Sequence, residues 1–390
     1  MKKGTTILTI ILFITIVMGG CKQSEAYNEL ITVDLTTSHP EKELILQDFM
    51  NVEYIALETN DEFITQGGLL AIGDKFIVVC NRSNDGEIFF FDRKTGKGVK
   101  KINRKGQGSE EYTYINKAVL DENKNELFVN CAGTKKIFVY DLSGNFKRSF
   151  KHTEGAEYME IVNYDEDNLI RYDVSEYYND GSDRGKQSYH AIISKQDGSI
   201  TKDISIPFDI VKPPKVQNQD GVAVASVSTI SPYFDNFLLA DTSSDTIYNY
   251  ISKENKLVPF LVQKPSVDPE IILNMGTITD RYYFIKTIKK TFDFTTGRGF
   301  PNSDLMYDKQ ENAVFNISVL NDDYLKKQKV DLTSKPINGK IATAQSLAAH
   351  RLVEAFENNE LKGKLKEIAA ELNEESNPVV MVMSVKTENN

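Results

Sequence analysis

The stretch "KGQGSEEY" (105–112) contains a Gly-x-Gly pair of the kind that can cradle a phosphate group. A phosphate loop needs a helix directly after its glycines, because the N–H groups at the helix N-terminus bind the anion. Here "TYINKAVLDENKNELFVN" follows, which has the pattern of two further strands joined by a turn. Gly106 and Gly108 therefore indicate a crossing between strands, in which both glycines are expected to adopt a positive φ.

The same stretch is interpreted as a structural connector rather than a binding loop. Glu111 is expected to accept backbone N–H bonds in the turn, and Tyr112 is expected to insert its ring between neighbouring sheets. The connector thus comprises Gly106, Gly108, Glu111 and Tyr112, and a shorter copy, "GAEY", ends at Tyr158.

No other spacing of reactive residues predicts catalysis, so the sequence predicts no catalytic residue, no metal site and no cofactor. The histidines are His39, His152, His190 and His350, each without the neighbours that a zinc site needs. Acidic clusters lie at predicted turns, where short carboxylates bond the local backbone. The stretch 177–185 superficially resembles a calcium loop, but it lacks the carboxylate spacing of an EF-hand.

Two long insertions between predicted strands, 171–187 and 290–304, are better placed to bind a ligand, because loops on a rigid scaffold often carry function. Their aromatic rings could stack on sugar rings or peptide side chains, and their arginines could pair with carboxylate or sulfate. The candidate ligand-binding residues are Tyr172, Tyr177, Tyr178, Arg184 and Arg298. The alternative is that the insertions are surface loops whose aromatic rings pack locally.

The elements that must position these residues repeat along the chain. The segment 86–112 aligns with 135–158, so that Ile88 matches Ile137 and Phe91 matches Tyr140. The offset of about 46 to 49 residues is typical of propeller blades. Weaker hairpin copies lie at 188–206, 245–262 and 304–320, with turns at Asp197-Gly198, Glu254-Asn255 and Glu311-Asn312. Five such hairpins and a divergent terminal unit predict an all-β chain folded as a six-bladed β-propeller.

The end of the chain departs from this pattern. Residues 341–376 predict a small helical insertion in the last blade, whose apolar stripe is formed by Leu361, Leu365, Ile368, Ala369 and Leu372. The hairpin is expected to pack on its own blade, with partner docking as the alternative. The segment 377–385 is predicted to be a closing strand that pairs with N-terminal residues near 52–58, within a propeller spanning 41–390.

The N-terminus has the features of a secretory leader. A basic start is followed by an apolar run over 7–18, which is too short for a comfortable membrane span. Val17 to Cys21 resembles a bacterial lipobox, which implies a signal peptide over 1–20, a lipidated Cys21 and a tether over 21–40. The partner implied is the membrane, reached through the lipid anchor; the alternative is an ordinary leader with a coincidental cysteine. Cys80 and Cys131 are expected to be free thiols at equivalent blade positions.

The net charge of the chain indicates which other classes of partner are disfavoured. The chain has a net charge of -10, which disfavours nucleic acid because phosphate contacts supply most of that affinity. A basic run over 93–106 is interpreted as a solvated face, with an anion-binding stripe as the alternative. Lys22 follows Cys21, so the aspartate that retains some lipoproteins at the inner membrane is absent, and outer-membrane residence is expected.

Taken together, the lipobox, "GQGSEEY" and "IFVYDLSGNF" resemble the six-bladed β-propeller lipoproteins of Bacteroidetes, which are related to NHL-repeat propellers. The resemblance covers about residues 40–385. It departs from the usual connector at Ser109 and Glu110, where that family commonly has Pro and Gly. It implies the fold and the location of the protein more than its activity.

The expected function is that of a lipid-anchored propeller in the cell envelope, acting as a non-enzymatic binding scaffold for a protein, peptide or glycan. The alternative is a propeller enzyme, a lyase or hydrolase on glycan or peptide, with its site at the mouth of the central channel. A third possibility is a structural component of an outer-membrane complex, which would expose an apolar patch of several hundred Å². The sequence leaves the periplasmic or surface facing open.

Overall fold

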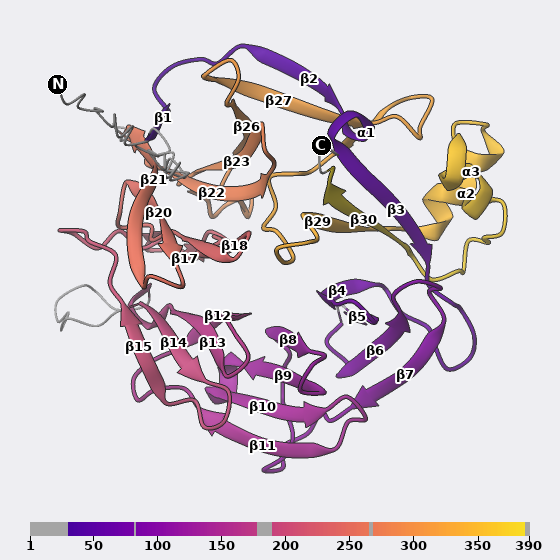
Figure 1. Ribbon diagram of the computed structural model, residues 1–390, viewed down its shortest axis with the longest axis horizontal. Coiled ribbons are helices and arrows are strands. Elements are labelled where there is room, and N and C mark those ends of the chain that lie inside the picture. Colours follow the sequence, from indigo (N-terminus) through magenta and orange to yellow (C-terminus); the bar gives the residue numbers. More distant parts are fainter. Residues whose placement is uncertain (1–29, 82, 178–188, 265–267, 387–390) are drawn as a thin grey trace, which may run out of the picture.

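The chain forms a disc of six sheets arranged around a central channel (Figure 1). The computed structural model describes residues 30–81, 83–177, 189–264 and 268–386. The predicted fold class, an all-β six-bladed propeller with a small helical insertion in the last blade, is confirmed.

Blades 1 to 3 are four-stranded antiparallel meanders whose first strand is innermost. Blade 1 comprises β4 (Gly68–Ile72), β5 (Phe76–Cys80), β6 (Glu87–Asp92) and β7 (Gly98–Asn103). Blade 2 comprises β8 (Lys117–Asp121), β9 (Glu126–Cys131), β10 (Lys136–Asp141) and β11 (Phe146–Lys151), with a 3-10 turn over Ala132–Thr134. Blade 3 comprises β12 (Tyr158–Asn163), β13 (Asn168–Asp173), β14 (His190–Ser194) and β15 (Ile200–Ile204), with a second 3-10 turn over Ser175–Tyr177.

Blades 4 and 5 each gain an outer strand from the N-terminal segment. Blade 4 comprises β18 (Ile230–Tyr233), β19 (Asn236–Leu239), β20 (Thr246–Ile251) and β21 (Lys256–Lys264), and β1 (Ile31–Asp34) pairs parallel to β21. Blade 5 comprises β22 (Ile271–Ile278), β23 (Tyr282–Lys289), β26 (Asn302–Asp308) and β27 (Ala313–Asn321), and β2 (Glu41–Ile45) pairs parallel to β27. A short strand, β28 (Gln328–Val330), also pairs with β27.

The pairing of β1 corrects the predicted tether over 21–40. Residues 31–34 belong to the folded disc, because Val33 is fully buried in the core between blades 4 and 5 and the strand follows β21 in register. Alternating burial along a strand of only four residues is a weak signal in a sequence, which is why the strand is not apparent before the structure.

Blade 6 closes the ring with both ends of the chain. It comprises β29 (Thr343–Leu347), β30 (Val379–Val385) and β3 (Met50–Ala56), which follows a short helix α1 (Leu46–Phe49). The β3 and β30 strands are antiparallel, from Met50 opposite Val385 to Ala56 opposite Val379. This is the pairing expected between the N-terminal strand and the closing strand.

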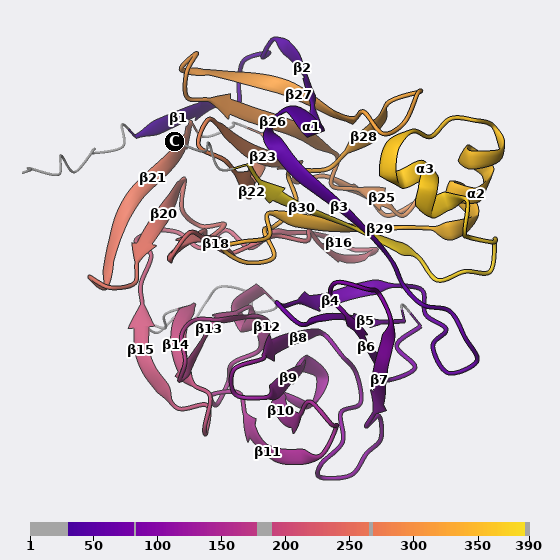
Figure 2. The ribbon, with the colours of Figure 1, turned by 45° about the vertical axis from the view of Figure 1, so that its right-hand side comes forward.

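The helical insertion is shorter than predicted. Helices α2 (Ala349–Glu357) and α3 (Gly363–Ala369) lie between β29 and β30 at the outer edge of blade 6 (Figures 1 and 2). Residues 343–347 form β29 instead of helix, because they pair with β30 and the ring needs that ladder. Leu361, Leu365 and Ala369 are buried against Val379 of blade 6, so the helices pack on their own blade.

The predicted repeat is visible in the packing. Ile88 packs in the core between blades 1 and 2, and its match Ile137 packs in the core between blades 2 and 3. Phe91 and Tyr140 each face the preceding blade. The weaker hairpin copies turn as predicted, since Gly198, Asn255 and Asn312 all have a positive φ.

The connector joins blades 1 and 2 by a different device from the one predicted. Gly106 and Gly108 do not have a positive φ. A Cβ atom on Gly106 would lie 1.9 Å from a carboxylate oxygen of Glu111, so the Glu111 side chain would have to move to admit one. That carboxylate accepts the Gly108 N–H at 2.9 Å. Tyr112 is fully buried between the two blades, as expected, and its ring packs edge-on against Tyr140.

Antiparallel meanders place two kinds of connection on one face of the disc, which we call the connector face. These are the connections from each fourth strand to the next blade and from each second strand to the third. Two hairpins stand on this face: β16 (Lys215–Asn218) with β17 (Gly221–Val224), and β24 (Phe292–Asp293) with β25 (Arg298–Gly299).

Replacing Tyr112 by phenylalanine is expected to destabilise the protein by about 1–3 kcal/mol. The buried Tyr112 hydroxyl donates to the Gly86 carbonyl at 2.7 Å and accepts the Arg104 N–H at 3.1 Å, so Tyr112→Phe leaves both backbone groups without this partner. The measurement is chemical denaturation, with Tyr114→Phe as the control, since that ring is 51% exposed. Equal midpoints for the two variants would contradict the account of the connector.

Candidate functional site

A cavity of about 310 Å³ opens within the ring beside blades 4, 5 and 6. We call it the channel pocket. Its wall includes Ser226, Asn274, Lys286, Phe300, Thr333 and Lys335. Most of these residues belong to the connector face or to the halves of the strands nearest to it, so the pocket opens on that face.

The channel pocket exists because blade 6 lacks an innermost strand. The segment 331–342 takes that place without joining a ladder. The segment contacts β22, where the Thr277 N–H donates to the Leu332 carbonyl at 2.8 Å. The approach at Gly276 is close, because a Cβ atom there would lie 2.5 Å from the same carbonyl oxygen. Further along, Asn338 donates to the Ile72 carbonyl of blade 1. The segment therefore contacts the blades on either side of blade 6, and its residues Thr333 and Lys335 line the pocket.

A row of polar residues crosses blade 5 at the pocket wall. Lys286 of β23 lies opposite Asn274 of β22 and Asp304 of β26 in the ladder. The Lys286 ammonium is 3.0 Å from Asp331, and the Thr333 hydroxyl lies 2.6 Å from Asp331 and 2.9 Å from Asp304. Although burial raises the pKa of Asp331, bonds from Thr333, Ser334 and Lys286 outweigh it and lower that pKa to about 2. Asp331 is therefore a fixed anion behind the Lys286 ammonium.

An ion pair crosses the centre of the disc at the floor of the pocket. Lys335 on the channel segment meets Glu160 on β12 of blade 3. The other oxygen of this carboxylate accepts the Thr229 N–H at 3.0 Å and the Thr229 hydroxyl at 2.7 Å. Burial raises the pKa of Glu160, but the Lys335 ammonium and the Thr229 bonds outweigh it and hold that pKa below its ordinary value. Blades 3, 4 and 6 thus converge on one carboxylate.

The rim of the channel pocket is apolar and strained. Phe300 lines the pocket with a φ of 54°, a conformation that is uncommon for an aromatic residue and is often found at ligand sites. The ring centroids of Phe300 and Phe292 are 5.6 Å apart. Phe300 also packs beside Ile288 and Ala225. The two hairpins of the connector face meet here, because Gly221 of β17 approaches the ring of Phe294.

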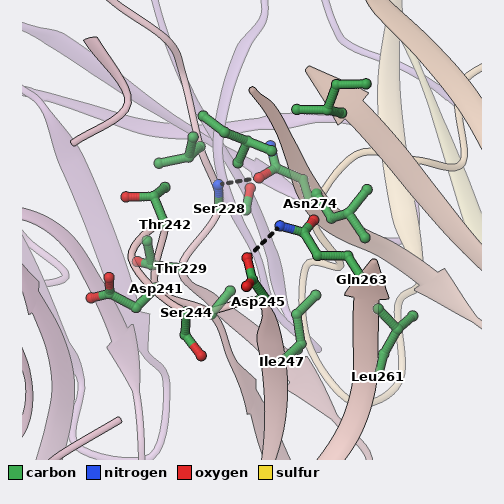
Figure 3. Close-up of a pocket in the computed structure, with 15 residues that line it drawn as sticks. Ser228, Thr229, Asp241, Thr242, Ser244, Asp245, Ile247, Leu261, Gln263 and Asn274 are labelled. Atoms are coloured by element: carbon green, nitrogen blue, oxygen red, sulfur yellow. Dashed lines mark hydrogen bonds between the residues drawn. The ribbon is translucent and has the colours of Figure 1, made fainter. Parts of the chain in front are cut away.

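A narrow crevice between blades 4 and 5 adjoins the channel pocket (Figure 3). Ser228 and Asn274 line both the crevice and the channel pocket. The Ser228 N–H donates to the side-chain oxygen of Asn274 at 3.2 Å. The crevice is lined on its other side by Asp241, Asp245 and Gln263. With a volume of only about 20 Å³ it holds about one water molecule, so the larger pocket is the candidate site.

The structure does not bring the predicted tyrosines to an open surface. Tyr172 is 1% exposed and its hydroxyl donates to Asp241 at 2.9 Å, while the Tyr177 hydroxyl donates to Tyr172 at 3.1 Å. Both rings pack in the core between blades 3 and 4. The prediction that these two rings stack on a ligand is therefore corrected: they satisfy a buried carboxylate and fill a blade interface, which was the local-packing alternative.

The other predicted ligand-binding residues remain predictions. Tyr178 and Arg184 lie outside the described residues. Arg298 is exposed on β25, two residues before Phe300, so the insertion 290–304 does reach the pocket. Cys80 and Cys131 are free thiols at the ends of β5 and β9, and Cys21 lies outside the described residues.

The charged lining residues Lys286 and Lys335, and the Glu160 carboxylate that pairs with Lys335, have no local signal of their own in the sequence. Glu160 and Lys335 are 175 positions apart, and neither belongs to a local motif. One signal was available: "TSKPINGK" (333–340) has turn residues where a sixth repeat should begin with a strand. That composition could have indicated that blade 6 lacks its first strand.

Histidines and metal-binding clusters do not contribute to the pocket. None of the described residues that line the pocket is a histidine. His152 and His190 are buried elsewhere, where they bond Asn130 and the Thr229 carbonyl. Across the described part of the chain, no three His, Cys, Asp or Glu side chains lie close enough to hold a metal ion.

The closed ring and the channel pocket define a six-bladed β-propeller with a ligand-sized cavity on one face. Within that class, the chain belongs to the family described as "Domain of unknown function (DUF4934)", whose model matches residues 30–384. No curated protein is similar enough to count as a match.

Several solved structures are similar to this chain at low sequence identity, and one of them has a TM-score above 0.5. A Bacteroides fragilis NCTC 9343 protein whose description proposes that it is exported has 16% identity and a TM-score of 0.61, over 92% of this chain and 100% of its own. A DUF4221 family member from Bacteroides vulgatus has 9% identity and a TM-score of 0.46, over 87% and 99%. BamB from Moraxella catarrhalis has 10% identity and a TM-score of 0.41, over 86% and 99%. The relationship to NHL-repeat propellers stays a prediction.

None of the helices in the described ranges has the length and apolar character that a membrane crossing needs.

Replacing Glu160 by glutamine is expected to destabilise the protein by about 3 kcal/mol at neutral pH, because it leaves the Lys335 ammonium largely buried and unpaired. The matched control is Asp74→Asn, which breaks the exposed pair with Lys340 on the same channel segment and is expected to cost under about 1 kcal/mol. Denaturation midpoints at pH 7 give both values.

The stability difference between wild type and Glu160→Gln is expected to depend on pH and to become smaller in acid. Because the pKa of Glu160 is lowered in the folded protein, its contribution is present above its ordinary value of 4.5 and is lost as pH falls through the lowered value. The difference in unfolding free energy between wild type and Glu160→Gln should therefore shrink below pH 4.5. A constant difference would show that the carboxylate is not held by charge.

Proposed function

We propose that this protein is a lipid-anchored binding protein of the cell envelope, in which the propeller is a non-enzymatic scaffold. Its ligand, a protein, peptide or glycan, would insert a side group into the channel pocket. The observation that carries this proposal is the pocket itself: an open cavity of about 310 Å³ on the connector face, lined by polar groups and one apolar wall.

The charged groups of the pocket are arranged for binding rather than for proton transfer. A glycosidase needs one carboxyl group whose pKa is raised toward the working pH. Asp331 and Asp304 both bond Thr333, but the pKa of Asp331 is lowered to about 2, and Asp304 pairs with Lys329 at 3.2 Å. Glu160 is held as an anion by Lys335. These groups lack the unequal acid and base that a hydrolase on this fold would use.

The location is supported by the leader and by a relative. The apolar run over 7–18 and the lipobox at Cys21 are features of an exported lipoprotein. The Bacteroides fragilis structure with the same fold is of a protein described in terms of export. We therefore propose that Cys21 carries the lipid and that the disc resides at the outer membrane, with its facing open to test by protease shaving of intact cells.

Replacing Cys21 by serine is expected to release the full-length protein from the membrane. Several acyl chains on Cys21 give lasting anchorage, at about 0.8 kcal/mol for each buried CH₂ group, and serine offers no thiol to acylate. Detergent phase partition should move from the detergent phase for wild type to the aqueous phase for Cys21→Ser. Cys131→Ser is the control, and it should partition like wild type. Retention of Cys21→Ser in the detergent phase would contradict the proposal that a lipid on Cys21 anchors the protein.

Replacing Phe300 by glycine is expected to lower capture of the envelope ligand at least ten-fold. The change removes the apolar wall of the pocket and relieves the strained backbone, so the fold should survive. Phe234→Gly is a matched control: Phe234 also has a positive φ, of 51°, is 62% exposed, and lies in a β18–β19 turn on the opposite face.

The measurement is pull-down from envelope extract with the wild-type, Phe300→Gly and Phe234→Gly proteins, followed by mass spectrometry of protein and glycan fractions. Equal capture by all three would contradict a role for the pocket. Chemical change in the captured glycan or peptide, seen as new ends after incubation, would favour the enzymatic alternative.

A further inference from the structure

We infer that the channel pocket recognises the acid group of a short acidic saccharide, with Lys286 and Lys335 as the residues that hold its carboxylate or sulfate. This rests on the proposed binding function and names its ligand class.

Among the described residues that line the pocket, the ionisable ones are lysines. Lys286 and Lys335 are the charged residues among those that line it, and their side chains are 23% and 22% exposed. A third lysine, Lys117 at the start of β8, is exposed and close enough to act on the charge of Lys335. Lysine is thus the charged residue type that the described lining presents to the cavity, although each of the two lining lysines is also paired with a carboxylate.

Both ammonium groups keep donors for a ligand. An ammonium group has three N–H donors and no acceptor. Within the described residues, Lys286 bonds one carboxylate, Asp331, and Lys335 bonds one, Glu160. These carboxylates lie outside the lining, so they fix the lysines from behind. Each lysine lines the pocket and has two donors that no described residue uses, and these can bond the oxygens of an anion.

The rest of the lining suits hydroxyl groups. The side chains of Ser226, Ser228 and Asn302 form no hydrogen bond with any described residue, and all three line the pocket. Each can both donate and accept, which matches a hydroxyl group. Several such groups around one cavity can bond several hydroxyls of one ligand at once.

The size and the apolar wall favour a sugar over a peptide. Ligand pockets usually span about 300–1,000 Å³, so a cavity of about 310 Å³ takes one or two rings. Phe300 and Ile288 offer one flat apolar wall, which can pack against the C–H face of a pyranose ring. A peptide segment would instead need backbone partners along an open groove or strand edge.

The test is calorimetric titration of the full-length lipidated protein in detergent with digalacturonic acid and with the uncharged disaccharide galactobiose. Wild type should bind the acidic sugar at least ten-fold more tightly, which corresponds to about 1.4 kcal/mol. Lys286→Gln should lose at least ten-fold for the acid and less than two-fold for the neutral sugar. Lys329→Gln is the control, since Lys329 pairs with Asp304 of the same blade but does not line the pocket.

Ionic strength provides a second measurement that needs no variant. Raising salt from about 0.05 to 0.5 M should weaken binding of the acidic sugar by wild type and leave the neutral sugar unchanged, because screening acts on the charge contact alone. Sulfated galactose should compete with digalacturonic acid if the anion, rather than the carboxylate geometry, is recognised; failure to compete assigns a carboxylate alone.

Equal affinity for the two disaccharides, no binding of either, or salt-independent binding of the acid would each overturn this inference. The proposed function fails by a different result. If the captured envelope ligand is lost in Phe300→Gly but unaffected in Lys286→Gln, the pocket binds a ligand without an acid group. If neither variant affects capture, the pocket is not the binding site.

Discussion

The buried ion pair between Glu160 and Lys335 is the interaction on which the centre of this propeller depends. A disc of six sheets leaves a channel, and the segment 331–342, which joins no ladder, lies beside it and contacts blades 1, 3 and 5. Lys335 holds that segment to the blade opposite, and Thr229 holds the same carboxylate to blade 4. Removing either charge would leave the other largely buried and unpaired, so the two must be present together. The pocket is the space that this arrangement leaves open.

Ring closure keeps the partners of this ion pair at a fixed separation. The first segment of the chain joins three consecutive blades, because β1, β2 and β3 pair with β21, β27 and β30. Lys42 of β2 reaches the buried carboxylate of Asp308 at 2.8 Å, which ties the segment to blade 5 by charge as well as by its ladder. Blades 4 to 6, which enclose the pocket, are therefore the blades that the N-terminal segment reinforces. A binding site between blades needs such a frame, since its walls come from separate sheets.

Most of the fold could be predicted because propeller blades are local structures. A hairpin such as 135–158 shows its strands, its turn and its connector within one window, and the packing of Ile137 then follows from its match with Ile88. The positive φ predicted for the connector glycines was wrong, and a side chain on Gly106 would instead meet the Glu111 carboxylate. The local sequence marks the turn by its glycines, but it does not show which neighbouring group lies beside them.

The site could not be predicted because its charged residues come from distant parts of the chain. Glu160 and Lys335 meet only when the ring closes, and neither has neighbours in sequence that mark it. Aromatic loops were the stronger signal, yet Tyr172 and Tyr177 turned out to serve a blade interface. The insertion 290–304 was the informative part of that prediction, because it places Phe300 at the rim of the pocket.

The most direct test of the central claim, that ligands meet this protein at the connector face, is photo-crosslinking in intact cells. A benzophenone amino acid would replace Asn302 at the pocket rim in one strain and Lys253, an 85% exposed residue on the opposite face, in another. The account predicts crosslinked adducts from position 302 and none above background from position 253. Adducts from position 253 alone, or equally from both, would contradict it.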